Sequence, residues 1–412
     1  MITYPKSLDT IFHKLYRHNI LPVIVGGYIR DALLGIPSND IDIELYGVSS
    51  LDKVEEILQE FGNVNSVGKS FGVCKMDYEN LDLDFSLPRE DNKIASGHQG
   101  FAIKIDKNLD FKTAALRRDF TINAIGYDVV SKKMLDPYHG REDLDKKILR
   151  SVDKQKFKED PLRVLRAVVF ASRFHMKLNK ILMLTCKEMI KEKLLEELPK
   201  ERVFQELQKL LLKSDKPSLG FNLLKDLGAF SFFKELAFLN TQEYKEVFNS
   251  LDMLKQLPIT NDKEFVILAL AVITSKFSII QTQTFLQRVT NEKKLIEKVL
   301  QLHTIDFNLD NFNDYDIYKL AQKTDIAFYA HYLHVTQKKQ KDTEYLLKKA
   351  KKLNVLHKPI PPLIRGKDLI ELGLQPSKKF SKILQSVYQA QIQNIFNTKS
   401  DALIWLKKNL LS

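Results

Sequence analysis

Two aspartates near the N-terminus, Asp40 and Asp42, have the residue type and the spacing best suited to chemistry. Residues 41–46 alternate apolar and acidic side chains, which predicts a strand with one polar face. On an extended segment both carboxylates therefore point to the same side. Such a pair is repulsive unless a cation neutralises it, and Mg²⁺ prefers a few carboxylate oxygens together with substrate phosphates. We predict that Asp40 and Asp42 are catalytic and hold Mg²⁺.

Two further features belong to the same predicted site. A third carboxylate on a neighbouring strand would complete a two-metal centre, which activates an attacking hydroxyl and stabilises a leaving pyrophosphate. Asp84 is the candidate for this metal ligand, and Asp82 is the alternative. Gly26 and Gly27 follow a strand-like run, and their missing side chains leave backbone N–H groups open to a triphosphate. Each feature alone is common as a turn or a polar strand face, but their combination points to nucleotidyl transfer.

The elements that must position these residues are of two kinds. In the first 150 residues, strand-like runs such as 21–25 and 81–87 alternate with helical patterns such as 28–34 and 51–61. This alternation predicts a head built on a small mixed sheet. After about residue 155 the strand signals fade, and the expected fold class becomes α+β with a long helical part. The clearest helical patterns there are 162–174, 181–195, 202–212, 243–257 and 264–273.

The length of 412 residues exceeds one ordinary hydrophobic core, so several domains are expected. The change of pattern near residue 150 and the three prolines between Leu356 and Pro362 suggest where boundaries fall. We predict a catalytic head over residues 1–150, a helical neck over 151–230, a helical RNA-binding body over 231–355 and a helical tail over 356–412.

Positive charge is concentrated outside the predicted head. The whole chain has a formal net charge of +12, yet residues 1–150 carry 20 Lys and Arg against 23 Asp and Glu. Residues 151–412 therefore have a balance of +15. A basic, AT-rich genome would spread lysine evenly, whereas a head that holds metal and an arm that binds a phosphate backbone explain the asymmetry. The expected partner is RNA.

Other sequence features exclude several classes of protein. Cys74 and Cys186 lie in unrelated contexts, which argues against a disulfide framework or a thiolate metal site. The N-terminus lacks the apolar segment of a signal peptide. The longest apolar run, Phe265–Ile273, is too short to cross a bilayer. We expect a cytoplasmic protein with no membrane contact and no stable protein partner.

Five segments resemble, in order, the motifs of the class II tRNA nucleotidyltransferase and bacterial poly(A) polymerase family. They lie between residues 20 and 210, about half of the chain, and the fifth is the weakest. The resemblance implies a polymerase beta-like nucleotidyltransferase head that uses Mg²⁺, CTP and ATP, with tRNA as the acceptor. The matching segments are residues 26–42, 117–124, 135–144, 159–167 and 199–206.

The resemblance also implies roles for basic and acidic side chains beyond the metal site. Asp160 and Arg163 lie three apart on a predicted helix and share a face. A carboxylate can accept from the amino group of cytosine or adenine while a guanidinium donates to the adjacent ring acceptor. The family assigns this pair the choice of base. Nucleotide-binding roles are likewise implied for Arg30, for Arg118 and Asp119 at the ribose, and for Arg166 at the triphosphate.

Several residues of the motifs are given structural rather than chemical roles. Asn123 is expected to brace the turn of the second motif, and Asp136 and Asp143 are expected to hold the head to the neck. For Glu201, Arg202 and Glu206 the structural interpretation is also preferred.

Members of this family differ in how many nucleotides they add. The segment from Arg89 to Arg117 resembles the long loop of enzymes able to use ATP, which favours CCA addition or A addition over CC addition. The sequence does not separate CCA addition, the preferred function, from A addition alone, and polyadenylation is the less favoured alternative. No histidine is followed by aspartate, so the phosphohydrolase domain of some relatives is not expected.

Two functions of other classes remain as alternatives. A catalytically silent RNA-binding protein could retain the fold, although Asp40, Asp42 and Asp84 are all present. Transfer of a nucleotide to a small molecule is a second alternative. The long basic arm argues against it, because a small acceptor needs no extended phosphate-binding surface.

Overall fold

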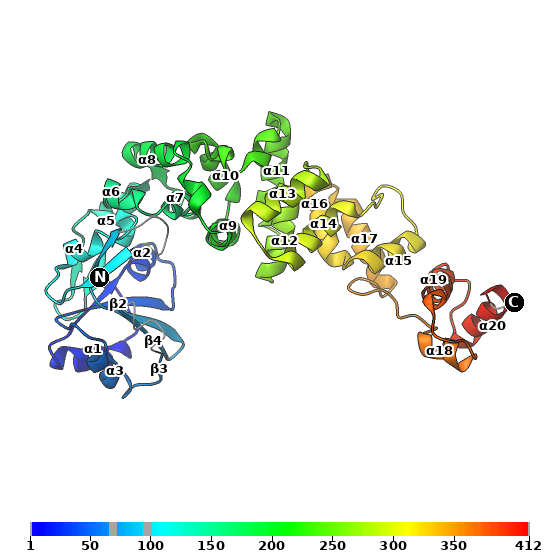
Figure 1. Cartoon of the computed structure of the whole chain (residues 1–412), viewed down its shortest axis with the longest axis horizontal. Helices are drawn as coiled ribbons and strands as arrows, with labels where there is room; N and C mark the ends of the chain where they lie inside the picture. Colours follow the sequence, from blue (N-terminus) through cyan, green and yellow to red (C-terminus); the bar gives the residue numbers. More distant parts are fainter. Residues whose placement is uncertain (1, 66–71, 94–100, 411–412) are drawn as a thin grey trace. The chain divides into compact units, whose positions relative to one another are not determined.

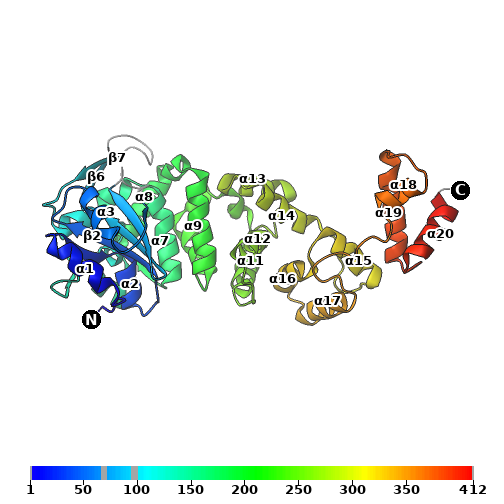
Figure 2. The same cartoon turned by 90° about the horizontal axis from the view of Figure 1, so that it is seen from below.

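The computed structural model describes residues 2–65, 72–93 and 101–410. The chain divides into two compact units, one comprising residues 1–238 with 288–291, and the other residues 239–287 with 292–412. The colours of Figure 1 follow the chain from the sheet-containing first unit to the helical second unit, and Figure 2 gives a second view of each. The predicted α+β class, a small mixed sheet followed by helices, is confirmed.

The first unit is built on a mixed sheet that has seven strands among the described residues. β2 pairs with β5 in parallel and with β1 antiparallel, so the two predicted acidic strands are neighbours at the centre of the sheet. In spatial order the strands are β3 (Val64–Asn65), β4 (Val73–Tyr78), β5 (Leu81–Ser86), β2 (Asp40–Tyr46), β1 (Leu21–Val25), β8 (Gly126–Asp128) and β9 (Lys133–Leu135).

The alternation along β2 divides its side chains between a core and an acidic face. Ile41, Ile43 and Leu45 are completely buried, while Asp40 is exposed and Asp42 is partly exposed. Burial of the three apolar side chains fixes the register, because a slip by one residue would turn all of them outward. The short helices of this region are α1 (Leu8–Arg17), α2 (Gly27–Leu33), α3 (Asp52–Leu58), α4 (Phe111–Ala115) and α5 (Gly140–Asp145).

Two small ladders complete the strands of the first unit. The hairpin of β6 (Arg89–Lys93) and β7 (Phe101–Ile105) lies in the segment that resembles the loop of enzymes able to use ATP. Residues 94–100 of that segment lie outside the described residues. The parallel pair of β10 (Ile148–Leu149) and β11 (Lys177–Leu178) connects the end of the sheet region to the helices that follow.

Five helices form the rest of the first unit, and amphipathic spacing explains their packing. α7 packs against both α9 and α10 and buries Val164, Ala167 and Val168 at helical spacing. The helices are α6 (Lys154–Lys158), α7 (Leu162–Arg173), α8 (Lys180–Lys191), α9 (Lys200–Lys213) and α10 (Pro217–Leu227).

All described elements after residue 240 are helices. The apolar run Phe265–Ile273 lies in α12, where every one of its residues is buried, so it is a core helix. None of the helices in the described ranges has the length and apolar character needed to cross a bilayer. The helices are α11 (Thr241–Leu254), α12 (Asp262–Ile273), α13 (Ile279–Val289), α14 (Lys293–Thr304), α15 (Asp314–Lys323), α16 (Ile326–Gln337), α17 (Gln340–Lys352), α18 (Gly366–Glu371), α19 (Lys378–Ile392) and α20 (Lys399–Leu410).

The last three helices have a small apolar core of their own. Leu369 of α18, Val387 of α19 and Leu406 of α20 are buried in one cluster. The Tyr315 hydroxyl on α15 donates to Gln389 on α19 at 2.9 Å, which joins this bundle to the preceding helices of the second unit.

Candidate active site

The acidic face of the sheet is formed by two paired strands. In the parallel register of β2 and β5, Asp40 lies opposite Asp82 and Asp42 lies opposite Asp84. Paired residues of neighbouring strands project to the same face, so all four carboxylates share it. Asp84 is the direct partner of Asp42, and Asp82 lies one pair away.

Repulsion and burial both act on the predicted metal ligands. Burial raises the pKa of Asp42, and the nearby Asp40 and Asp84 raise it further, while Arg118 opposes the shift. Burial raises the pKa of Asp40 as well, with contributions from Asp84 and Asp82. A bound cation would offset this repulsion, so the two carboxylates fit a divalent metal ion.

Asp84 differs from the other two because it already has a cationic partner. Lys75 of β4 donates to both of its carboxylate oxygens, at 2.8 and 2.7 Å. In the part of the chain that the structure describes, no group of three or more Asp, Glu, His or Cys side chains has an arrangement that could hold a metal. The structure therefore offers the pair Asp40 and Asp42 as metal ligands, with Asp84 beside them.

The turn between β1 and α2 requires glycine at position 26. Gly26 has φ of 71°, in the left-handed region, and a Cβ built on it would lie 2.6 Å from Nη1 of Arg118. Gly27, by contrast, begins α2 and lines the cavity described below. The immediate role of Gly26 is thus to let a guanidinium approach the backbone beside Asp42.

A buried glutamate at the end of the acidic face holds two arginines. Glu44 accepts from Arg117 Nη2 at 2.5 Å and from Arg118 Nη2 at 3.3 Å. Burial alone would raise the pKa of Glu44, but Arg118 and Arg117 outweigh burial and keep it below its ordinary value. Glu44 therefore stays ionised and fixes the two guanidinium groups. The Asp40-x-Asp42-x-Glu44 alternation was the signal that could have identified it.

A buried polar network connects the first, second and fourth motifs. Arg30 donates to Asn123 Oδ1 at 2.6 Å, and Asn123 Nδ2 donates to Asp119 Oδ1 at 2.9 Å. Arg166 donates through Nε to Asp119 Oδ2 at 2.7 Å. Burial would raise the pKa of Asp119, but Arg166 and Asn123 hold it low. Asp119 is thus an ionised acceptor, as the expected bracing role of Asn123 requires.

Arg30 is more a structural residue than a free ligand for phosphate. It is 5% exposed, forms an ion pair of 2.7 Å with Asp31, and its guanidinium lies over the rings of Phe170 and Phe174. One of its edges nevertheless reaches the cavity wall.

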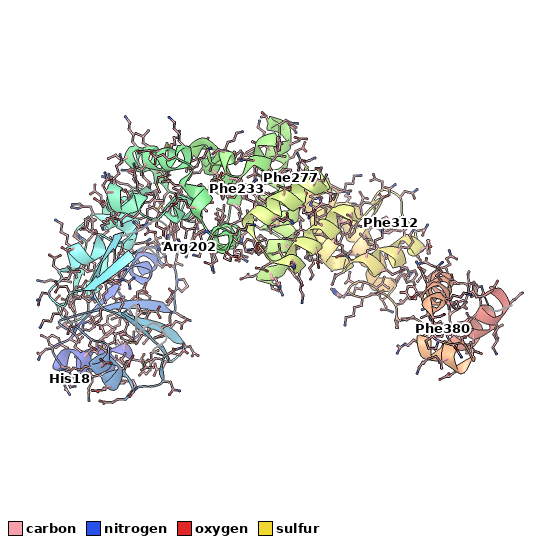
Figure 3. The ribbon with its side chains drawn as sticks, in the orientation of Figure 1. His18, Arg202, Phe233, Phe277, Phe312 and Phe380 are labelled. Carbon is pink, nitrogen blue, oxygen red and sulfur yellow. The ribbon has the colours of Figure 1, made fainter. Side chains whose placement is uncertain are left out.

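Other residues hold the side chains of Asp160 and Arg163, the predicted base-selecting pair. Arg163 donates to the backbone carbonyl oxygens of Lys156 and Arg117, each at 2.7 Å. Asp160 is paired with Arg202 of α9, whose Nη2 lies 2.9 Å from Asp160 Oδ2; Figure 3 labels Arg202. Arg202, for which the sequence favours a structural role, is therefore part of the site. Its position 42 residues further along the chain gave no local signal.

These side chains enclose one cavity of about 550 Å³. Nine of the eleven predicted site residues line it, and Gly26 and Asp84 are the two that do not. Among the described residues its wall includes six arginines and four aspartates, so an acidic corner faces a strongly basic pocket. The lining residues are Gly27, Arg30, Asp40, Asp42, Arg117, Arg118, Asp119, Asn123, Asp160, Leu162, Arg163, Arg166 and Arg202.

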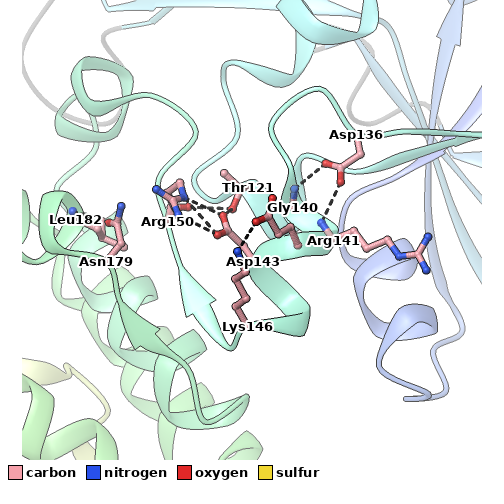
Figure 4. Close-up of polar contacts among 10 residues, drawn as sticks. Thr121, Asp136, Gly140, Arg141, Asp143, Lys146, Arg150, Asn179 and Leu182 are labelled. Atoms are coloured by element: carbon pink, nitrogen blue, oxygen red, sulfur yellow. Dashed lines mark hydrogen bonds and ion pairs between the residues drawn. The ribbon is translucent and has the colours of Figure 1, made fainter.

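The third motif forms a separate polar cluster, shown in Figure 4. Asp143 accepts from the Thr121 hydroxyl at 2.7 Å and from Arg150 Nε at 3.0 Å. Asp136 accepts from the backbone N–H groups of Gly140, at 2.7 Å, and Arg141, at 3.0 Å, at the start of α5. These contacts connect the second motif to the strand β10.

The fifth motif contributes one buried acid, Glu206, on α9. Glu206 is 3% exposed and accepts from Lys209 at 2.7 Å, while Glu201 accepts from Asn291 at the same distance. Both contacts are within the first unit and away from the cavity lining.

Comparison with protein-family models gives three matches along the chain. Residues 23–150 match the model described as the poly A polymerase head domain. Residues 175–239 match a probable RNA and SrmB-binding site of polymerase A, and residues 259–406 match a putative tRNA nucleotidyltransferase domain 2.

Curated relatives and solved structures agree with these matches. The multifunctional CCA protein of Chromobacterium violaceum is 37% identical over 206 residues, which are 50% of this chain and 48% of that protein. Its counterpart in Xanthomonas campestris pv. campestris is 38% identical over 209 residues, with the same coverage. The chain thus spans about half the length of the curated relatives it matches. A CCA-adding enzyme in an apo form has a TM-score of 0.73 at 20% identity, covering 100% of this chain and 96% of that one, which shows a shared fold.

Proposed function

We propose that the chain, whose segments match models of the poly A polymerase head domain and of a tRNA nucleotidyltransferase domain, is a nucleotidyltransferase that adds C, C and A to the 3′ end of tRNA. The nucleotides come from CTP and ATP, and no nucleic acid acts as template. One observation carries the proposal: an acidic sheet face opens into an arginine-lined cavity that also contains the Asp160–Arg202 pair.

In this proposal Asp40 and Asp42 hold Mg²⁺, with Asp84 as a third ligand. Bound Mg²⁺ would lower the pKa of the tRNA 3′-hydroxyl and neutralise charge on the leaving pyrophosphate. Arg166, fixed by Asp119, binds and orients the triphosphate, while Arg118, fixed by Glu44 and close to Gly26, lies with Asp119 at the ribose. Asp119 is also the acceptor proposed for the ribose hydroxyl.

Asp160 and Arg163 are the groups proposed to choose the base. The carboxylate accepts from the amino group of cytosine or adenine, and the guanidinium donates to the neighbouring ring acceptor. Uracil and guanine have the opposite polarity there and would leave a buried group unpaired, at about 1–3 kcal/mol each. The contact with Arg202 supports this role, because two hydrogen bonds from the guanidinium limit the rotation of the Asp160 carboxylate.

The four predicted regions have separate proposed tasks. Residues 1–150 carry the catalytic head and 151–230 the neck with the base-selecting helix. Residues 231–355 bind RNA through their basic helices, and residues 356–412 contact the tRNA. The cytoplasm is the proposed compartment, because both tRNA and its CTP and ATP are supplied there.

A addition alone is the second candidate function, and polyadenylation is the third. The names of the matched relatives support CCA addition over both. A catalytically silent RNA-binding protein is disfavoured because Asp40 and Asp42 are both present on the cavity wall.

The proposed function is tested with tRNA transcripts that end at the discriminator base, at C or at CC. Each transcript is supplied with Mg²⁺ and with CTP, ATP or both, and the products are read at single-nucleotide resolution. We expect all three to be completed to CCA. Extension of the CC-ended transcript alone would replace CCA addition with A addition, and no extension of any transcript would refute the enzyme assignment.

A further inference from the structure

Lys75 projects onto the acidic face of the sheet from the strand next to β5. In the antiparallel register of β4 and β5 it lies opposite Asp84, and Asp84 in turn lies opposite Asp42. Paired residues share a face, so the three side chains form a row across three strands. A lysine ammonium thereby lies in line with carboxylates proposed to hold a metal.

The contact of Lys75 with Asp84 uses the atoms that a metal would need. Nζ lies 2.8 Å from Oδ1 and 2.7 Å from Oδ2, so one ammonium occupies both oxygens of the carboxylate. The side chain of Lys75 is 64% exposed and that of Asp84 is 24% exposed. The lysine can therefore swing into solvent without disturbing the core, while Asp84 stays where β5 holds it.

We propose that Lys75 is a built-in counter-ion, which occupies Asp84 until a divalent cation displaces it. The inference rests on the proposed function, because it assumes that Asp40 and Asp42 bind the metal. Asp84 can then bind the metal only after Lys75 has moved away, so Lys75 lowers the affinity of the site for metal. Asp40 and Asp42 would bind the ion first, and Asp84 would join them when the divalent charge of the ion displaces the single charge of the Lys75 ammonium.

The expected size of the effect follows from the exposure of Lys75. Ion pairs with a solvent-exposed partner are weak, so displacement of the lysine should change metal affinity by roughly two- to five-fold. A change of this size is measurable by direct titration, and it would be hard to see in a steady-state rate.

The test is a titration with Mn²⁺ in the absence of nucleotide, followed by the electron paramagnetic resonance signal of the free ion. We expect Lys75→Met to bind Mn²⁺ roughly two- to five-fold more tightly than the wild type, and Lys75→Arg to resemble the wild type. Lys133→Met is the matched control, because it removes one exposed positive charge from β9, at the opposite edge of the same sheet.

A second pair of variants separates a specific contact from a general change of charge. On an Asp84→Asn background, the proposal expects Lys75→Met to have no further effect on Mn²⁺ affinity. The proposal would be overturned if Lys75→Met raised the Mn²⁺ affinity equally in the wild-type and Asp84→Asn backgrounds. It would also be overturned if Lys75→Met and the wild type bound Mn²⁺ with the same affinity. Asp42→Ala tests the metal site itself. If the wild type binds no Mn²⁺, or if Asp42→Ala binds as much Mn²⁺ as the wild type, both the proposed metal site and the inference fail.

Discussion

At the scale of single residues, the site uses arginine to fix carboxylates and carboxylates to fix arginine. Glu44 holds Arg117 and Arg118, Asp119 holds Arg166, and Arg202 holds Asp160. Such charge-assisted contacts are directional, so each partner restricts the orientation of the other. The cavity is therefore preorganised before a nucleotide enters it.

The contact between Arg202 and Asp160 predicts that Arg202→Ala relaxes base selection. Without the guanidinium, the Asp160 carboxylate can rotate away from the base, and UTP and GTP are then rejected less strongly. We expect the kcat/KM ratio of CTP over UTP to fall by roughly 5- to 100-fold, the equivalent of one buried hydrogen bond to a charged group. Filter binding of tRNA should stay within about two-fold of the wild type.

Asp160→Ala should relax the ratio at least as much as Arg202→Ala. Arg141→Ala is the control, since Arg141 is exposed and engages Asp136 only through its backbone N–H. An unchanged CTP preference in Arg202→Ala would show that Asp160 needs no partner for recognition.

The raised pKa of Asp42 predicts that this carboxylate destabilises the folded head at neutral pH. Because the folded pKa lies above the unfolded one, the folded state binds more protons between the two values, and stability falls as pH rises through that window. Asp42→Asn removes the buried charge and with it this loss of stability. In metal-free buffer we expect its Tm to exceed that of the wild type at pH 7, by a few degrees at most.

The difference in Tm should shrink as the pH is lowered below the ordinary range of an aspartate, because the wild-type carboxyl is then protonated in both states. Thermal melts followed by circular dichroism at several pH values provide the measurement. A lower Tm for Asp42→Asn at every pH would mean that the electrostatic attraction between Asp42 and Arg118 outweighs burial.

At the scale of elements, the helices and strands that the sequence periodicity predicted lie within a few residues of observed ones. The predicted strand 21–25 coincides with β1, and the predicted helices 162–174 and 264–273 correspond to α7 and α12. Strands of two or three residues, such as β8 and β10, were missed because so few positions cannot display an alternation. The periodicity also could not predict the order of the strands in the sheet, because that order depends on contacts between distant segments.

The same distinction explains which parts of the site were anticipated. Asp40, Asp42, Asp160 and Arg163 could be proposed because their motifs are local. The partners Lys75 and Arg202 could not be assigned, because each meets its counterpart only after the chain has folded. Glu44 had a local signal in the acidic alternation, but its pairing with Arg117 did not. The role of a charged side chain is set by what lies opposite it, and the sequence alone does not contain that pairing.

The start of α5 predicts that Gly140→Ala destabilises the first unit. A Cβ at this position would lie 2.2 Å from the carbonyl oxygen of Thr121, so the backbone must move and the cluster of Figure 4 must loosen. We expect a loss of about 1–3 kcal/mol in the free energy of unfolding, measured by urea denaturation of the full chain. Gly366→Ala, where an added Cβ meets nothing within 4 Å, is the control and should have little effect.

At the scale of the whole molecule, the uneven charge predicts how tRNA binding responds to salt. Helix α17 carries exposed lysines at 348, 351 and 352, in the part of the chain with a balance of +15. If these lysines neutralise phosphates, replacing all three with Gln lowers the salt slope of log affinity by roughly 0.7–0.9 for each phosphate that is no longer neutralised.

Filter binding of tRNA between about 50 and 200 mM salt measures the slope. The control is a variant that replaces three exposed lysines of the first unit, Lys53, Lys132 and Lys133, with Gln. If both triple variants change the slope equally, the helical region has no special part in holding RNA.

The parallel pairing of β2 with β5 also bears on when the protein becomes competent during its synthesis. Asp42 and Asp84 are 42 residues apart, and a parallel pair needs the whole intervening crossover before its strands can meet. Long-range pairing of this kind forms late, because the entropy of closing the loop must be lost first. Arg202 arrives later still on the ribosome. A nascent chain that has released only its first eighty residues therefore carries the residues Asp40 and Asp42 without an active centre, and is chemically inert until the neck has emerged.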